Sequence, residues 1–163
     1  MTQNPNAAAP KHAVDILNED HQKVLRLLEQ VEATEDGREK RRLAQDIFVE
    51  IEVHAKLEEE IFYPALLRRA ESEELKKLLH ESTEEHHVAS ILVDELKPMS
   101  TTDPRYDAKF KVLMEAVEHH SKEQIEDTFP DVRETLGEEG MTLGAKMMER
   151  KQELTPPEHR KAA

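Results

Sequence analysis

Four stretches of this 163-residue chain repeat apolar residues every three or four positions, which is the period of an amphipathic helix. Helices are therefore predicted over about 13–33, 38–70, 72–96 and 106–136, with Pro64 kinking or stopping the last turns of the second. Short connections between long helices favour antiparallel neighbours. We expect an all-α fold, an antiparallel up-down-up-down four-helix bundle, followed by a short C-terminal helix around Met141–Met148.

The domain organisation that follows has three parts: a disordered N-terminal tail at 1–12, the bundle at 13–136, and a short helix with a flexible tail at 137–163. The chain has no cysteine, no signal-peptide pattern and no run of apolar residues long enough to span a membrane, so we expect a cytoplasmic protein. Its net charge of −13 repels phosphate backbones and anionic lipids. Neither nucleic acid nor a membrane is therefore an expected partner, and the sequence leaves the oligomeric state open.

Each of the four apolar stripes is interrupted by one histidine near the middle of its predicted helix. These residues are His21, His54, His86 and His120. One inward histidine is usually a core residue with a hydrogen-bond partner, but four at a common depth would each cost about 1–3 kcal/mol if left without partners. A shared metal ion removes that cost, so the four imidazoles are predicted metal ligands. Without cysteine, such a site must use nitrogen and oxygen donors.

Carboxylates follow two of these histidines at helical spacing, which places them on the same helix face. Glu58 is four residues after His54, and Glu123 is three residues after His120. The segments His54–Pro64 and His120–Pro130 resemble each other, and this internal repeat indicates two helical hairpins related by a pseudo-twofold axis. In the repeat, Gln124 is the equivalent of Glu58. Because an amide is a weak ligand for a hard ion, we expect Glu123 to take its place.

The remaining acidic and histidine residues are predicted to have ordinary surface roles. Solvated or helix-pairing charges are expected at Glu59, Glu60, Glu84 and Glu85, surface or second-shell positions at His87 and His119, and exposed side chains at His12, His80 and His159. The methionines near the C-terminus are expected to pack in the core.

Several of these motifs together resemble the hemerythrin-like (HHE cation-binding) proteins over about residues 13–136. The resemblance depends on Glu-Asp-His21, on His54-x-x-x-Glu58-Glu59 with Phe62-Tyr63-Pro64, on Glu85-His86-His87-Val88, and on His120 with Phe129-Pro130. It implies a bundle holding two iron ions bridged by oxo or hydroxo groups and carboxylates, with an open position for dioxygen, peroxide or nitric oxide. The implied ligands are His21, His54, Glu58, His86 and His120, with the last carboxylate falling on Glu123 or Gln124. Manganese and zinc are the less favoured ions.

Two departures from the family pattern shape the functional prediction. Oxygen-carrying hemerythrins have two histidines four residues apart on the third helix, whereas here Ser82 lies four residues before His86. The second departure is Gln124, an amide at the position equivalent to Glu58. Fewer protein ligands favour sensing or redox chemistry over reversible oxygen carriage. An enzymatic version would turn over peroxide as a peroxidase or catalase does, although no catalytic residue is identified. The competing hypothesis is a helical interaction or regulatory module that binds zinc or no metal.

Overall fold

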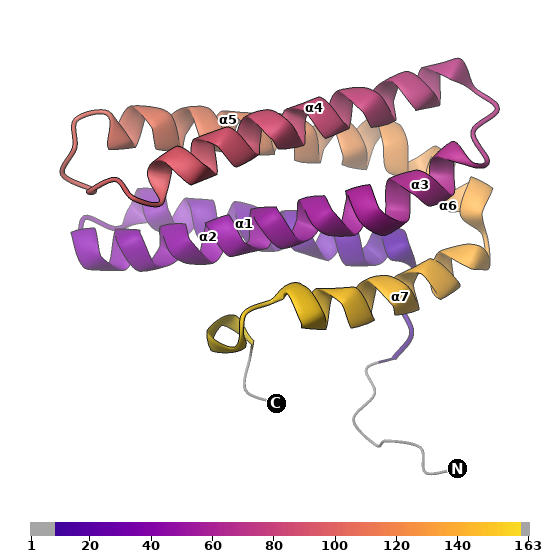
Figure 1. Cartoon of the computed structure of the whole chain (residues 1–163), viewed down its shortest axis with the longest axis horizontal. Helices are drawn as coiled ribbons and strands as arrows, with labels where there is room; N and C mark the ends of the chain where they lie inside the picture. Colours follow the sequence, from indigo (N-terminus) through magenta and orange to yellow (C-terminus); the bar gives the residue numbers. More distant parts are fainter. Residues whose placement is uncertain (1–8, 161–163) are drawn as a thin grey trace, which may run out of the picture.

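The computed structural model describes residues 9–160. All regular elements in this part of the chain are helices, and it contains no strand (Figure 1). The predicted all-α class is therefore confirmed. Four long segments form a helical bundle, and their main helices are α1 (Ala13–Ala33), α2 (Gly37–Leu57), α4 (Glu73–Leu96) and α5 (Tyr106–Glu123). α1 packs on α2 and α4 packs on α5, and the two pairs face each other.

The second and fourth segments each change their helical geometry in their C-terminal half. α2 continues through the π-helical turn η1 (Glu58–Phe62) into α3 (Tyr63–Leu67). In the same way, α5 continues through the π-helical turn η2 (Gln124–Thr128) into α6 (Phe129–Leu136).

Proline explains both π-helical turns. Pro64 and Pro130 lack the N–H that a regular helix would use at those positions. The residue before each proline donates instead to a carbonyl five residues back, from Tyr63 to Glu58 and from Phe129 to Gln124. The helix therefore continues past Pro64 to Leu67 rather than stopping there, because the wider turn absorbs the missing hydrogen bond.

Side-chain caps mark the starts of α2 and α4. The Asp36 carboxylate accepts hydrogen bonds from the first backbone N–H groups of α2, and the Ser72 hydroxyl accepts one from Leu75 in α4. These caps satisfy N–H groups that have no partner within the helix. They fix the short connections that hold neighbouring helices together.

The hydrophobic core consists of two clusters on either side of the histidine level. One cluster is built around Leu17, Phe62 and Phe129. The other is built around Phe48 and Phe110. Since each histidine lies between the two clusters along its own helix, apolar layers close the bundle above and below the four imidazoles.

The last helix, α7 (Glu139–Leu154), lies along α1 and α2 (Figure 1). It is longer than the expected short helix. Its Leu143 and Met147 are buried in the first cluster, so α7 is part of the hydrophobic core. Two glycines on its inner face, Gly140 and Gly144, allow the chain before α1 to pack closely against it.

The prediction of an exposed His12 is wrong. His12 is 6% exposed, caps α1 by accepting from the Val14 N–H, and fills the space beside Gly140. The end of the expected tail is thus packed against α7, while positions 1–8 and 161–163 of the expected tails lie outside the described residues. Within residues 9–160, no helix combines the length and the apolar character needed to cross a membrane.

The close contact at Gly144 generates a stability prediction. A Cβ there would overlap the backbone carbonyl of Lys11, which cannot move as a flexible side chain can. Gly144→Ala should therefore lower the free energy of unfolding by about 1–3 kcal/mol, measured by urea denaturation.

Gly37→Ala is the matched control, because the nearest atom to a Cβ at Gly37 is the Thr101 Oγ1 at 3.8 Å. This helical glycine should tolerate the change or gain up to about 1 kcal/mol. Equal stability of Gly144→Ala and the wild type would contradict the packing of α7 on the chain before α1.

Candidate metal centre

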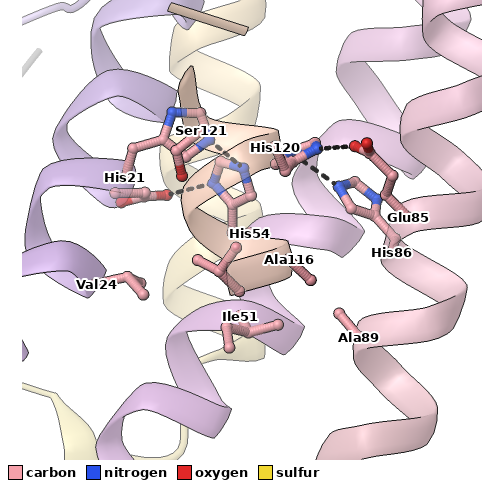
Figure 2. Close-up of a pocket in the computed structure, with 12 residues that line it drawn as sticks. His21, Val24, Ile51, His54, Glu85, His86, Ala89, Ala116, His120 and Ser121 are labelled. Carbon is pink, nitrogen blue, oxygen red and sulfur yellow. Dashed lines mark hydrogen bonds and ion pairs between the residues drawn. The ribbon is translucent and has the colours of Figure 1, made fainter. Parts of the chain in front are cut away.

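The four predicted histidines meet at one level of the bundle as two pairs (Figure 2). The Nε2 atoms of His21 and His54 are 3.0 Å apart, and those of His86 and His120 are 3.3 Å apart. The His54 and His120 rings lie 6.1 Å apart between their centroids, which links the two pairs. All four side chains are buried. The convergence expected from their positions in the apolar stripes is therefore what the structure has.

Glu58 lies between the two pairs and is fully buried. Its Oε2 is 3.1 Å from the Nε2 of His86 and 3.5 Å from the Nε2 atoms of both His54 and His120. One carboxylate oxygen thus faces imidazoles of both pairs.

Two side chains hold Glu58 in this position. The Tyr63 hydroxyl donates to Oε2 at 2.6 Å, and the Gln124 amide donates to Oε1 at 2.7 Å. The same amide donates to the Tyr63 oxygen at 2.8 Å, so the three groups form a closed network. Glu58 and Gln124 are the first residues of the two π-helical turns, and π-helical turns are frequent at functional sites.

Carboxylates also face the outer ring nitrogens of three of the histidines. Glu59 lies 2.9 Å from His86 Nδ1, and Glu85 lies 2.8 Å from His120 Nδ1, as Figure 2 shows for Glu85. On the other side of the site, the buried Asp20 lies 3.7 Å from His54 Nδ1. A carboxylate at Nδ1 holds the proton there and leaves the Nε2 lone pair free to bind a metal, which is a recurrent arrangement in metal sites.

The sequence alone does not identify this outer set of carboxylates. Of the two roles expected for Glu59 and Glu85, solvated or helix-pairing charges, the structure has the second, and the partner of each is a buried imidazole of another helix. Their position next to Glu58 and next to His86 was the available signal. Asp20, directly before His21, was named only as part of a motif.

The structure also separates Glu123 from Gln124. Gln124 is 1% exposed and faces Glu58, whereas Glu123 is only partly buried and lies with Glu85 and His119 in a separate group. The expected placement of Glu123 in the central group therefore does not match the geometry. A residue four positions after His120 lies about 40° from its direction, and one three positions after it lies about 60° away on the other side.

The other histidines lie outside the central group. His80, His87 and His119 are exposed, and His119 Nε2 is 3.6 Å from Glu85. His159 is partly buried, with Nδ1 3.0 Å from Asp46, so it is less exposed than expected.

Burial and neighbouring charges give the central groups unusual protonation. Burial and the nearby His54 lower the pKa of His21 to about 2, so this ring is neutral. Burial also disfavours the charged form of His54, but the Glu58 and Asp20 carboxylates outweigh it and raise the pKa of His54 to about 9. Although burial opposes its ionisation, the imidazoles of His54 and His120 hold the pKa of Glu58 well below its usual range. The buried, ionised Glu58 carboxylate is therefore stabilised by positive charge on the groups around it.

The donor atoms form two overlapping groups that could each hold a metal ion. One group consists of His21, His54 and His120, and a second consists of Glu58, His86 and His120, with the donor atoms of each group within 4.8 Å of one another. Two ligand nitrogens about 2.1 Å from one ion are about 3.0–3.4 Å apart for ordinary bond angles. The 3.0 and 3.3 Å separations within the two histidine pairs match that spacing.

A small cavity of about 40 Å³ adjoins the imidazoles. Its walls are mostly apolar, and Val24, Ile51, Ala89 and Ala116 lie on one side of the histidine level in Figure 2. A volume of this size holds a water-sized or diatomic molecule, and its apolar walls offer few partners to water itself.

The match to a protein family agrees with a cation-binding site. The sequence matches the family described as Hemerythrin HHE cation binding domain over residues 12–132. It is similar to a DNA nickase of Nostoc sp. (strain PCC 7120 / SAG 25.82 / UTEX 2576), with 23% identity over 125 residues that cover 77% of this chain. The chain spans only 34% of the length of that relative. No solved structure matches significantly.

The network around Glu58 predicts which residue of the Glu123–Gln124 pair matters. Gln124→Ala removes a fully buried donor to Glu58 and leaves a cavity. It should destabilise the metal-free protein by about 2–4 kcal/mol in urea denaturation.

Glu123→Gln is the control from the neighbouring position. It changes a partly exposed carboxylate, so its effect should stay within about 0.5 kcal/mol. A larger loss in Glu123→Gln than in Gln124→Ala would show that the assignment of the inward-facing residue is wrong.

Proposed function

Because this chain belongs to the hemerythrin HHE cation-binding family, we propose that it holds two iron ions and binds, senses or reacts with dioxygen, peroxide or nitric oxide. The observation that carries the proposal is a cluster of four buried imidazoles, three of which face one fully buried carboxylate, that of Glu58. We also propose that the four segments run up-down-up-down, since that arrangement brings the midpoints of the four helices to one level.

The two donor groups support a dinuclear centre. His21 and His54 would hold one ion, His86 would hold the other, and Glu58, which faces imidazoles of both pairs, would serve as a carboxylate ligand between them. His120 belongs to both groups and lies at hydrogen-bond distance from His86. Imidazoles suit iron, and carboxylates favour its higher oxidation state, so this donor set fits iron better than it fits magnesium or calcium.

Bound iron would supply redox chemistry and an open coordination position, and the residues around it define what can reach that position. The apolar side chains Val24, Ile51 and Ala89 exclude charged and bulky molecules from the cavity. Glu59 and Glu85 hold the protons of His86 and His120 on Nδ1. The cavity thus suits a neutral molecule of two or a few atoms.

The inward side chains of Ser82 and Gln124 favour sensing or redox chemistry over reversible oxygen carriage. Ser82 is buried at the position where oxygen carriers have a further histidine. Gln124 donates its amide N–H groups to Glu58 and Tyr63, so its nitrogen is committed to the network. A centre with fewer protein donors has more positions for exogenous ligands.

The similarity to a DNA nickase does not lead us to propose nuclease activity. The similarity covers 34% of that protein, and the net charge of −13 opposes binding to a phosphate backbone. The competing hypothesis remains an interaction module that holds zinc or no metal.

Metal content tests the proposal most simply. Protein purified without a histidine tag should contain close to two irons per chain, absorb in the near ultraviolet and lose that band on reduction. His21→Ala and His54→Ala should each lower the iron content sharply and remain folded, because apolar layers lie on both sides of the site.

His80→Ala and His87→Ala are matched controls, since both histidines are exposed and outside the central group. Both controls should retain their iron. Full iron retention in the His21 and His54 variants, or stoichiometric zinc in a colourless wild type, would refute the iron assignment.

The raised pKa of His54 predicts that metal binding releases protons. His54 is protonated below its pKa of about 9 in the metal-free protein, and a metal must bind its neutral form. Calorimetric titration with Mn²⁺ at about pH 7.5, in buffers of different ionisation enthalpy, should therefore detect at least about one released proton per chain.

The same shift sets a pH dependence of stability. A histidine whose pKa is raised by folding stabilises the protein below its unfolded pKa of about 6.5. The His54 contribution is then lost as the pH rises through about 9.

For the calorimetric titration, metal binding without proton release at about pH 7.5 would contradict the protonation of His54.

A further inference from the structure

The C-terminal helix α7 reaches the metal centre through one side chain. The family match ends at residue 132, whereas α7 spans Glu139–Leu154. Near the end of this helix, the Lys151 ammonium forms an ion pair with Asp20 Oδ1. The helix therefore contributes a charge to the site from outside the matched domain.

Asp20 connects Lys151 to the central group. Its side chain is only 4% exposed, and its second oxygen, Oδ2, lies 3.7 Å from His54 Nδ1. Neither Oδ2 nor this Nδ1 has a hydrogen-bond partner among the described residues, and the two atoms lie within ion-pair distance of each other. Lys151, Asp20 and His54 thus form a chain from α7 to the centre.

Lys151 and His54 are the cationic groups within ion-pair distance of Asp20 in the described part of the protein. A buried carboxylate is costly unless it is paired. Without Lys151, keeping an ionised Asp20 aimed at His54 becomes unfavourable. His54 then loses the ionised carboxylate that faces its Nδ1 and favours this orientation of its ring.

The packing of α7 against the rest of the bundle holds Lys151 close to Asp20. Leu143 and Met147 are buried in the core, and Gly140 and Gly144 allow close contact with the chain before α1. Arg150, the neighbour of Lys151, forms a second ion pair, with Glu60 on η1, on the exposed side of α7. These contacts fix the position from which Lys151 reaches Asp20.

We infer that Lys151 is a positioning residue of the metal centre, which acts through Asp20 on His54, so that α7 is part of the site and not only a covering helix. This inference rests on the proposed function, because it concerns the affinity of the same histidines for metal.

The test measures Mn²⁺ affinity in the full chain by calorimetry. Lys151→Met should weaken binding about tenfold, at the low end of the effect of removing an outer partner of a ligand. Lys151→Arg should restore most of the affinity, because it keeps the charge. Arg150→Met is the matched control on α7, and its affinity should stay within about twofold of the wild type, since Arg150 pairs with the exposed Glu60.

A double-mutant cycle separates positioning from a general loss of structure. Asp20→Asn should weaken binding at least as much as Lys151→Met, and the double variant should be no weaker than Asp20→Asn alone. Losses that simply add would show that Lys151 does not act through Asp20. Thermal unfolding of each metal-free variant establishes that it is folded.

The outcomes for this inference and for the proposed function differ. If the wild type binds Mn²⁺ and Lys151→Met binds it equally well, or no worse than Arg150→Met does, the inference is wrong and the metal site stands. If the wild type binds neither Mn²⁺ nor iron, both fail together.

Discussion

The burial of the Glu58 carboxylate at the centre of the bundle is the constraint on which the rest of the site depends. A fully buried anion is tolerated only with strong hydrogen bonds and nearby positive charge. Tyr63 and Gln124 supply the hydrogen bonds, and three imidazoles surround one of its oxygens. The imidazoles alone meet the need for charge only by taking up protons, whereas metal ions meet it directly.

The backbone is adapted to the same constraint. Pro64 and Pro130 force wide turns that begin at Glu58 and Gln124, the two residues of the central network that come from equivalent positions of the internal repeat. The two hairpins have therefore diverged in chemistry while keeping their geometry. One supplies the carboxylate, and the other supplies the amide that holds it.

Much of this arrangement was accessible from the sequence, because helix periodicity places His21, His54, His86 and His120 on inner faces and puts Glu58 beside His54. The partners of Glu59 and Glu85 were not accessible, since their position next to Glu58 and next to His86 does not tell which imidazole of another helix each of them faces. The prediction for Glu123 failed for a different reason. It weighed ligand strength and overlooked that a buried amide can serve the carboxylate instead of the metal.

The central claim is that the two histidine pairs hold two ions bridged by Glu58. Anomalous diffraction at the iron absorption edge, from crystals of iron-loaded protein, tests it most directly. We expect two peaks about 3.5–4 Å apart, one beside His21 and His54 and the other beside His86 and His120. A single peak, or iron bound only at the surface group of Glu85, His119 and Glu123, would contradict it.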